Sequence, residues 1–234
     1  MKGSGLWTLA RLAVPLVVAV ALSGCTAYSP RGPLVTDYFP LQAGSLWDYQ
    51  VASGDNALDV QVTARPGAKY QGNQTTALYY QVGGLTTQVE YYTGDWNRIE
   101  QVRMDKVQGT VTGSGQAASF SELEENPPLL VMDLNALVPP YQWEVDQTLA
   151  TKGDGTFTSK TMFTALGFES VTVPAGTFPR ALHIHFTRTV TAADGSNVEV
   201  SGDRWFAPGT GLVKAIDQMG STVVEMQLKD STIR

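Results

Sequence analysis

The chain has 234 residues, of which 43% are hydrophobic and only 16% are charged, and its mean hydropathy is −0.09. This composition excludes a disordered chain and a membrane protein with many spans. The formal net charge of −6 and the lack of any Lys or Arg cluster exclude nucleic acid as a partner and electrostatic binding to anionic lipids. Frequent Thr, Val and Tyr, together with 23 Gly, favour strands and turns over helices.

The first 24 residues have the pattern of a secretory leader. Lys2 and Arg11 carry positive charge, and residues 12–22 form an apolar run too short for a permanent membrane helix. The tetrapeptide Leu-Ser-Gly-Cys that ends at Cys25 resembles the lipobox of bacterial lipoproteins, in which the thiol receives a diacylglycerol. Because Cys25 is the only cysteine, neither an internal disulfide nor a zinc cluster explains it. We therefore expect a signal peptide over residues 1–24 and lipidation of Cys25.

The segment after the cysteine sets the expected location. Residues 25–37 contain Pro and Gly without an apolar period, which predicts a flexible tether. Loss of the leader would leave 14 basic against 22 acidic residues, and a chain with this negative charge is not attracted to anionic lipids. The acyl chains at Cys25 would therefore provide the membrane attachment. Thr26 in place of Asp resembles outer-membrane sorting in Gram-negative lipoproteins. We expect a lipid-anchored protein of the cell envelope, on the periplasmic or surface face of the outer membrane if the host has one.

From Tyr38 onward the hydrophobic period is two, which is typical of strands. Residues 180–190 place three apolar side chains on one face and His183 and His185 on the other, and residues 224–229 alternate in the same way. Further strand candidates are residues 45–52, 58–64, 76–82, 85–93, 98–104, 107–112 and 197–206.

Helix signals are nearly absent. Only residues 117–125 look helical, and the Asn-Pro-Pro that follows ends that segment. The carboxylates Glu122, Glu124 and Glu125 would then lie on a solvated helix face. Without long helices to connect parallel strands, the sequence predicts a mainly β fold. One strongly curved antiparallel sheet, a half-barrel or barrel-like, would form a single domain over residues 38–234 with at most one or two short helices.

The most apolar run after the leader covers residues 129–138, with a pair of prolines on each side. Its length suits a crossing segment between two halves of the sheet or a short helix over the open face of the sheet. Two interpretations stay open: these side chains fill the core, or they cover a ligand cavity. In the second case the ligand-binding residues would be Leu130, Met132, Leu134 and Leu137.

Three segments carry a family resemblance. Residues 37–49 (DYFPLQAGSLWDY), 171–178 (VTVPAGTF) and 204–214 (RWFAPGTGLVK) resemble the motifs YFPLxxGxxWxY, VxVPAGxF and WFAPGxGLVK of uncharacterised bacterial envelope lipoproteins. The resemblance implies a twisted antiparallel sheet similar to the half-barrels of periplasmic lipoprotein-localisation factors, without an assigned reaction or catalytic residues. The Pro and Gly residues of the two later motifs suit turns, and Trp47 and Trp205 suit the core face of a sheet.

The residues that carry chemistry are few. The sequence has no nucleophile elbow, zinc-protease motif, phosphate loop or dinucleotide pattern. His183 and His185 share one strand face and would hold a metal only if a carboxylate such as Glu199 came from a neighbouring strand. Histidines that face solvent or a partner explain the same spacing. We therefore expect no cofactor, no metal and no catalytic site.

Three functional hypotheses remain. The first is a binding module whose curved sheet holds a hydrophobic or amphiphilic envelope molecule. The second is a structural or assembly lipoprotein that docks on an envelope protein complex through tyrosines, since aromatic residues are enriched in interfaces. The tyrosines concerned are Tyr79, Tyr80, Tyr91 and Tyr92. The third, a hydrolase or metal-dependent enzyme, is disfavoured by the missing catalytic residues.

Overall fold

The computed structural model describes residues 32–108, 119–151 and 155–234. The expected signal peptide, the lipidation site at Cys25 and most of the expected tether lie outside this part of the chain. Within it, none of the helices is long and apolar enough to cross a membrane.

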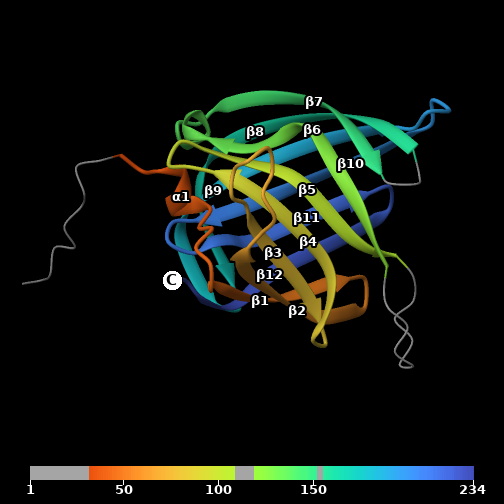
Figure 1. The fold of residues 1–234 in the computed structure, drawn as a ribbon. Coiled ribbons are helices and arrows are strands. Elements are labelled where there is room, and N and C mark those ends of the chain that lie inside the picture. Colours follow the sequence, from red (N-terminus) through yellow and green to blue (C-terminus); the bar gives the residue numbers. More distant parts are fainter. Residues whose placement is uncertain (1–31, 109–118, 152–154) are drawn as a thin grey trace, which may run out of the picture. The chain divides into compact units, whose positions relative to one another are not determined.

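Twelve strands in the described residues form a closed antiparallel barrel (Figure 1). Each strand pairs with its neighbours in sequence, and β12 pairs with β1 to close the ring. The strands are β1 (Leu46–Ser53), β2 (Asn56–Pro66), β3 (Thr76–Val82), β4 (Leu85–Gly94), β5 (Arg98–Gln108), β6 (Ser119–Asp133), β7 (Tyr141–Thr151), β8 (Gly155–Val173), β9 (Gly176–Thr191), β10 (Asn197–Ala207), β11 (Gly211–Met219) and β12 (Thr222–Thr232). Closure pairs the first and last strands, which would otherwise be exposed edges. The predicted mainly β fold with a strongly curved sheet is confirmed.

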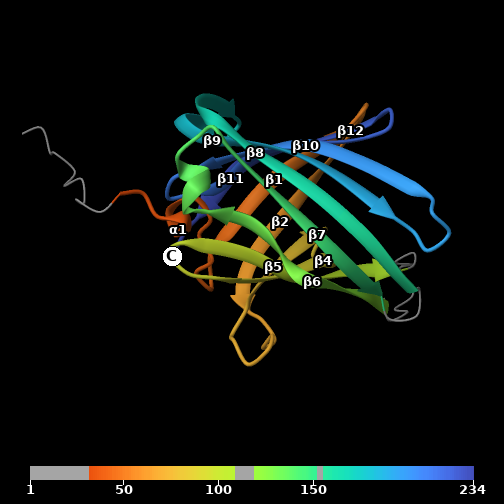
Figure 2. The same ribbon diagram turned by 90° about the horizontal axis from the view of Figure 1, so that it is seen from above.

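The two ends of the barrel differ (Figures 1 and 2). One end, called here the covered end, carries α1 (Val35–Tyr38), the 3-10 helix η1 (Leu134–Leu137) and the C-terminus. The opposite end, called here the hairpin end, includes the tight turns that join β1 to β2, β3 to β4, β9 to β10 and β11 to β12. Both helical elements of the described residues therefore lie at the covered end.

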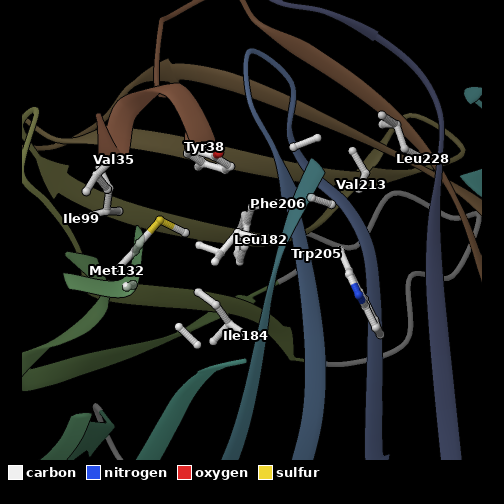
Figure 3. Close-up of a cluster of buried hydrophobic side chains, with 14 of the residues drawn as sticks. Val35, Tyr38, Ile99, Met132, Leu182, Ile184, Trp205, Phe206, Val213 and Leu228 are labelled. Atoms are coloured by element: carbon white, nitrogen blue, oxygen red, sulfur yellow. The ribbon is translucent and has the colours of Figure 1, made fainter. Parts of the chain in front are cut away.

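A hydrophobic core fills the covered end (Figure 3). Ile99 and Met132 are fully buried, and so are Leu182 and Ile184 of β9. Burying side chains of this size stabilises a fold by about 1.5–3 kcal/mol each. The alternation predicted for residues 180–190 is correct, because the apolar side chains face this core and the two histidines face outward.

The folded part of the chain begins earlier than the expected boundary at residue 38. Val35 has no exposed surface, and its backbone N–H donates to the carbonyl of Trp96 at 3.1 Å. The Val35 side chain packs against the core because α1 covers the end of the barrel. Residues 33–37 therefore belong to the barrel and not to a tether.

The helix predicted over residues 117–125 is wrong. Residues from Ser119 onward belong to β6, and residues 117 and 118 lie outside the described part. The Glu-rich composition favours a helix locally, but pairing with β5 gives these carboxylates partners, as when Arg103 contacts Glu122 at 3.1 Å. Glu125 points into the barrel and is 1% exposed. Tertiary pairing thus overrides local propensity here.

Strands β6 and β7 pair over only four residues, and the ladder stops at the pair Asn126 and Thr148. Two prolines follow in β6, and proline has no N–H to donate. Side chains of β7 replace the missing backbone bonds. Trp143 Nε1 donates to the Leu130 carbonyl at 2.9 Å, and Gln147 Nε2 donates to the carbonyl of the first proline at 2.8 Å.

Two of the sequence motifs meet at the covered end. The Gly209 N–H donates to the carbonyl of Asp37 at 2.7 Å, and Trp47 Nε1 donates to the carbonyl of Thr210 at 2.7 Å. Gly211 has a φ of +92°, and a Cβ there would lie 3.0 Å from Pro40 Cδ. The segment after β10 therefore needs glycine because it packs directly against the segment before β1.

Candidate functional site

The interior of the barrel contains a cavity of about 370 Å³, within the usual range of ligand sites. Its wall begins among core residues of the covered end, such as Trp47 and Phe206, and also includes Val51, Asp217 and Val224, each two residues from a hairpin turn. The cavity therefore extends toward the hairpin end. Its aromatic wall consists of Phe39, Trp47, Tyr49, Tyr80, Tyr92, Phe163, Phe186 and Phe206.

The four ligand-binding residues predicted from sequence lie next to this cavity and do not line it. Met132 and Leu137 are buried in the core of the covered end, and Leu130 and Leu134 pack against that core. The wall contains two other residues of β6, which are Leu129 and Val131. A register shift in the pairing of β5 with β6 changes which side chains of this apolar segment face inward. Of the segment, only η1 is helical.

Glu90 is the centre of a hydrogen-bonded group in the cavity wall. Its Oε2 accepts from the hydroxyls of Tyr80 and Tyr92, both at 2.7 Å, and its Oε1 accepts from Gln88 Nε2 at 2.6 Å. Burial, together with the charge of Glu90, raises the pKa of both tyrosines well above the ordinary value. These hydroxyls therefore stay protonated and continue to donate to the carboxylate.

A second charged pair lies in the same wall. Arg204 Nη2 donates to Asp217 Oδ1 at 2.6 Å, and its Nη1 donates to the carbonyls of Asp203 and Ile216 at 3.1 and 3.2 Å. The guanidinium also lies 5.0 Å from the centre of the Phe186 ring, which is a cation–π distance. Arg204 is thus held on several sides.

Arg188 and Glu125 form a looser pair. Arg188 Nε donates to Ser159 Oγ at 2.8 Å, while Nη2 lies 3.6 Å from Glu125 Oε1, beyond hydrogen-bond distance. Neither carboxylate oxygen of Glu125 has a hydrogen-bond partner within the described residues. Burial raises the pKa of Glu125 to about 7, against the opposing effect of Arg188. Sequence reasoning missed this pair because it assigned Glu125 to a solvated helix.

The four tyrosines proposed as a docking surface do not share one surface. Tyr80 and Tyr92 face the cavity, whereas Arg65 lies over the ring of Tyr79 at 4.7 Å. Arg103 lies over the ring of Tyr91 at 4.9 Å. Adjacent residues of a strand point to opposite faces, so each Tyr-Tyr pair is divided between inside and outside.

His183 and His185 lie on the outer face of β9, beside β10. His183 Nε2 and His185 Nδ1 lie 2.8 and 3.0 Å from Asp203 Oδ1, and His183 Nδ1 lies 3.1 Å from Glu169 Oε1. The neighbouring carboxylates are therefore Asp203 and Glu169 and not Glu199. Glu199 pairs with Thr189, farther along the same two strands. Among the described residues, no group of three or more His, Cys, Asp and Glu could hold a metal ion.

The two tryptophans of the motifs, Trp47 and Trp205, differ in position. Trp47 lines the cavity as the sequence predicts. Trp205 stacks on His183 with ring centres 4.4 Å apart and lies on the side of β10 opposite to Phe206, which lines the cavity. Trp205 nevertheless belongs to the buried hydrophobic cluster, as its predicted place in the core requires, although it does not line the cavity.

Comparison of the chain with protein-family models finds no match, and comparison with curated protein sequences finds none either. Solved structures with a similar fold include a candidate lipoprotein from Parabacteroides distasonis, at 15% identity and a TM-score of 0.52, with 86% of this chain and 100% of that chain covered. A candidate exported protein with a YmcC-like fold from Bacteroides fragilis has 14% identity and a TM-score of 0.53, with coverage of 83% and 98%. At these identities the similarity shows the shared fold alone.

Proposed function

We propose that this protein is a non-catalytic lipoprotein of the cell envelope that holds a hydrophobic or amphiphilic molecule inside its barrel. The observation that carries the proposal is the aromatic cavity of about 370 Å³, which is bounded at the covered end and extends toward the hairpin end. Cavities with apolar walls and a few placed polar groups are typical of sites for small amphiphiles. The descriptions of the two structural neighbours, a lipoprotein and an exported protein, are consistent with an envelope location.

Membrane attachment through lipidated Cys25 is part of this proposal. The lipobox-like Leu-Ser-Gly-Cys supports it, as does the exit of the chain from the folded barrel at Pro33, a few residues later. We expect the natural chain to partition into the detergent phase of a Triton X-114 extraction. Cys25→Ser should stay in the aqueous phase or keep its leader. Equal partitioning of both chains with the leader attached would contradict the anchor.

Ligand binding is tested by photo-crosslinking in isolated membranes that contain the full chain. A long-chain lipid probe with a diazirine should label peptides that line the cavity, and unlabelled competitor should reduce the labelling. Val224→Trp, which narrows the cavity, should lower labelling several-fold. Val223→Trp is the matched control because its side chain is 47% exposed on the opposite face of β12. Equal labelling of both variants, or none of the natural chain, would contradict the proposal.

The alternative, an assembly protein that docks on an envelope complex, has one supporting observation. Leu85, Met219 and Val223 are about half exposed, and all three lie at turns of the hairpin end. Exposed apolar groups that gather at one end of a protein indicate contact with a partner. A defined envelope protein that co-purifies stoichiometrically after mild solubilisation, with no lipid retained in native mass spectrometry, would favour this alternative.

A further inference from the structure

Arg188 differs from the other charged groups that line the cavity. Glu90 already accepts three hydrogen bonds, and Arg204 is held by a carboxylate and two backbone carbonyls. Arg188 donates from Nε to Ser159, and its Nη2 reaches Gln147 Oε1 only at 3.4 Å. Within the described residues, no acceptor contacts Nη1 of Arg188. A guanidinium with an unused donor thus faces the cavity, whereas the other charged groups of the wall, Glu90 and Arg204, already have their partners.

The charge of Arg188 is incompletely balanced. Its nearest carboxylate, Glu125, lies 3.6 Å away and does not itself line the cavity. Since burial raises the pKa of Glu125 to about 7, this carboxylate carries only part of its negative charge at neutral pH. An arginine in a site of low dielectric is stabilised when a full anion completes its coordination.

An unpartnered hydroxyl lies beside Arg188. Thr161 is the direct register partner of Arg188 across β8 and β9, lines the cavity and is 1% exposed. Its Oγ1 is buried and has no hydrogen-bond partner in the part of the chain that the structure describes. Buried polar groups are nearly always hydrogen-bonded, so this hydroxyl has its hydrogen-bonding capacity available beside Arg188. Phe163 and Phe186, two residues from Thr161 and Arg188 along the strands, supply an adjoining apolar wall.

We infer that Arg188 and Thr161 bind the anionic head group, a carboxylate or a phosphate, of a single-chain amphiphile whose apolar chain lies along Phe163, Phe186 and Leu129. This inference rests on the proposed function and names the class of its ligand. Arginine binds carboxylate and phosphate oxygens through parallel N–H donors, and a threonine hydroxyl adds a further donor. A cationic head group at Glu90 is disfavoured because the donors around that carboxylate are already in place.

The test compares three photoactivatable probes with the same long chain and different heads: a carboxylate, a phosphate monoester and a neutral alcohol. The full chain is labelled in isolated membranes, labelled peptides are mapped by mass spectrometry, and the midpoint of competition by each unlabelled amphiphile is measured. Arg188→Met is made in the Glu125→Gln background, because removal of Arg188 alone would leave a buried carboxylate without its cation. Arg180→Met in the same background is the matched control, since Arg180 is exposed on the same strand.

In the Glu125→Gln background, Arg188→Met should raise the midpoint for at least one anionic probe by about tenfold, the effect of losing a charge-assisted hydrogen bond. The midpoint for the alcohol should stay within about twofold. Glu125→Gln alone should lower the anionic midpoints, because the competing carboxylate is gone. The anionic probe whose competition midpoint rises on loss of Arg188 identifies the head group as carboxylate or phosphate.

Other outcomes overturn the inference. If loss of Arg188 changes the competition midpoints of the anionic and neutral probes in parallel, or changes none of them, the arginine does not recognise the head group. Binding in the cavity would still stand in that case. Failure of all three probes to label cavity peptides of the natural chain would overturn the proposed function together with the inference.

Discussion

At the scale of single residues, Glu125 is a buried carboxyl group whose protonation affects stability. Its side chain is buried, the guanidinium of Arg188 is 3.6 Å away, and the negative charge of Glu90 also raises its pKa. Gln147 of β7 contacts the same arginine. A carboxyl group with a raised pKa favours the folded state when protonated.

This arrangement predicts a pH-dependent effect of Glu125→Gln. The contribution of Glu125 to stability is fully present below its ordinary pKa and is lost as pH rises through about 7. The free energy of unfolding of the variant, minus that of the natural chain, should therefore increase by up to about 3 kcal/mol between pH 5 and pH 8. Urea denaturation at a series of pH values measures this difference.

Glu144→Gln is the control for this titration, because Glu144 pairs with Lys160 on the outer face at 2.8 Å. The free energy of unfolding of Glu144→Gln should stay within about 0.5 kcal/mol of that of the natural chain at every pH. A flat profile for Glu125→Gln as well would mean that Glu125 is as readily ionised in the folded chain as in the unfolded one.

The residues of the site show what the period-two alternation of a sequence can predict and what it cannot. It correctly assigned the two histidines to the outer face of β9 and could have divided each Tyr-Tyr pair, since neighbours in a strand cannot share a face. It could not identify Glu90 or Arg188 as partners of the cavity. The partner of an inward polar side chain can be predicted only when the strands opposite to it are known. Those strands are set by how the twelve strands of the described residues close into a barrel.

At the scale of elements, strands with regular alternation and glycine turns were predictable, and β3 has the predicted bounds Thr76–Val82. The failure at residues 117–125 has a specific cause. Glutamates in that segment find partners on β5 or inside the barrel, so their pattern reflects pairing with distant residues and not an exposed helix. Of the two interpretations left open for the apolar segment that follows, the structure agrees with core filling, since Met132 and Leu137 are buried in the core. The register shift between β5 and β6, which changes the residues that face inward, cannot be seen in the sequence.

The first residue of β11, Gly211, gives a prediction at this scale. Gly211→Ala should destabilise the protein through two effects: the φ of +92°, and the approach of the new Cβ to Pro40, at 3.0 Å from Cδ. We expect a loss of about 2–3 kcal/mol, seen as a lower midpoint of thermal unfolding. The cause is that α1 and the segment before β1 would be pushed away from the end of the barrel.

Gly220→Ala separates these two effects. Gly220 has a φ of +59° in the turn between β11 and β12, and a Cβ there would meet nothing within 4 Å. The Gly220→Ala variant should lose only about 1 kcal/mol of unfolding free energy, because a residue with a Cβ is disfavoured at a positive φ. If both substitutions lower the midpoint equally, the approach of the new Cβ at position 211 to Pro40 adds no cost.

At the scale of the whole molecule, closure is the property on which the cavity depends. A half-barrel, which the sequence left open as an alternative, would expose the inner face of the sheet to solvent. The ring instead places residues from β3, β4, β8 and β9 around one enclosed space, although these strands are far apart in sequence. Composition and period predict a curved sheet but not closure, because the pairing of β1 with β12 joins segments more than 160 residues apart.

Closure is testable with an engineered disulfide. Gln50 and Gln227 are register partners across β1 and β12, and they lie on the outer side of the wall, since their neighbours Tyr49, Val51 and Met226 line the cavity. Opposed residues of antiparallel strands have Cβ atoms about 4.5–5.5 Å apart, near the range that a disulfide spans. In a background with Cys25→Ser, the double variant Gln50→Cys and Gln227→Cys should therefore form a cross-link on mild oxidation, seen as a mobility shift on a non-reducing gel.

The matched pair Gln50→Cys and Thr187→Cys should not cross-link, because Thr187 lies on β9, separated from β1 by β12, β11 and β10. In a half-barrel, β1 and β12 would be opposite edges of an open sheet, and both pairs would stay reduced. Rapid cross-linking of the first pair alone would therefore show that β1 pairs with β12 and closes the barrel. Closure in turn is what places Arg188 and Glu90 in the wall of one cavity.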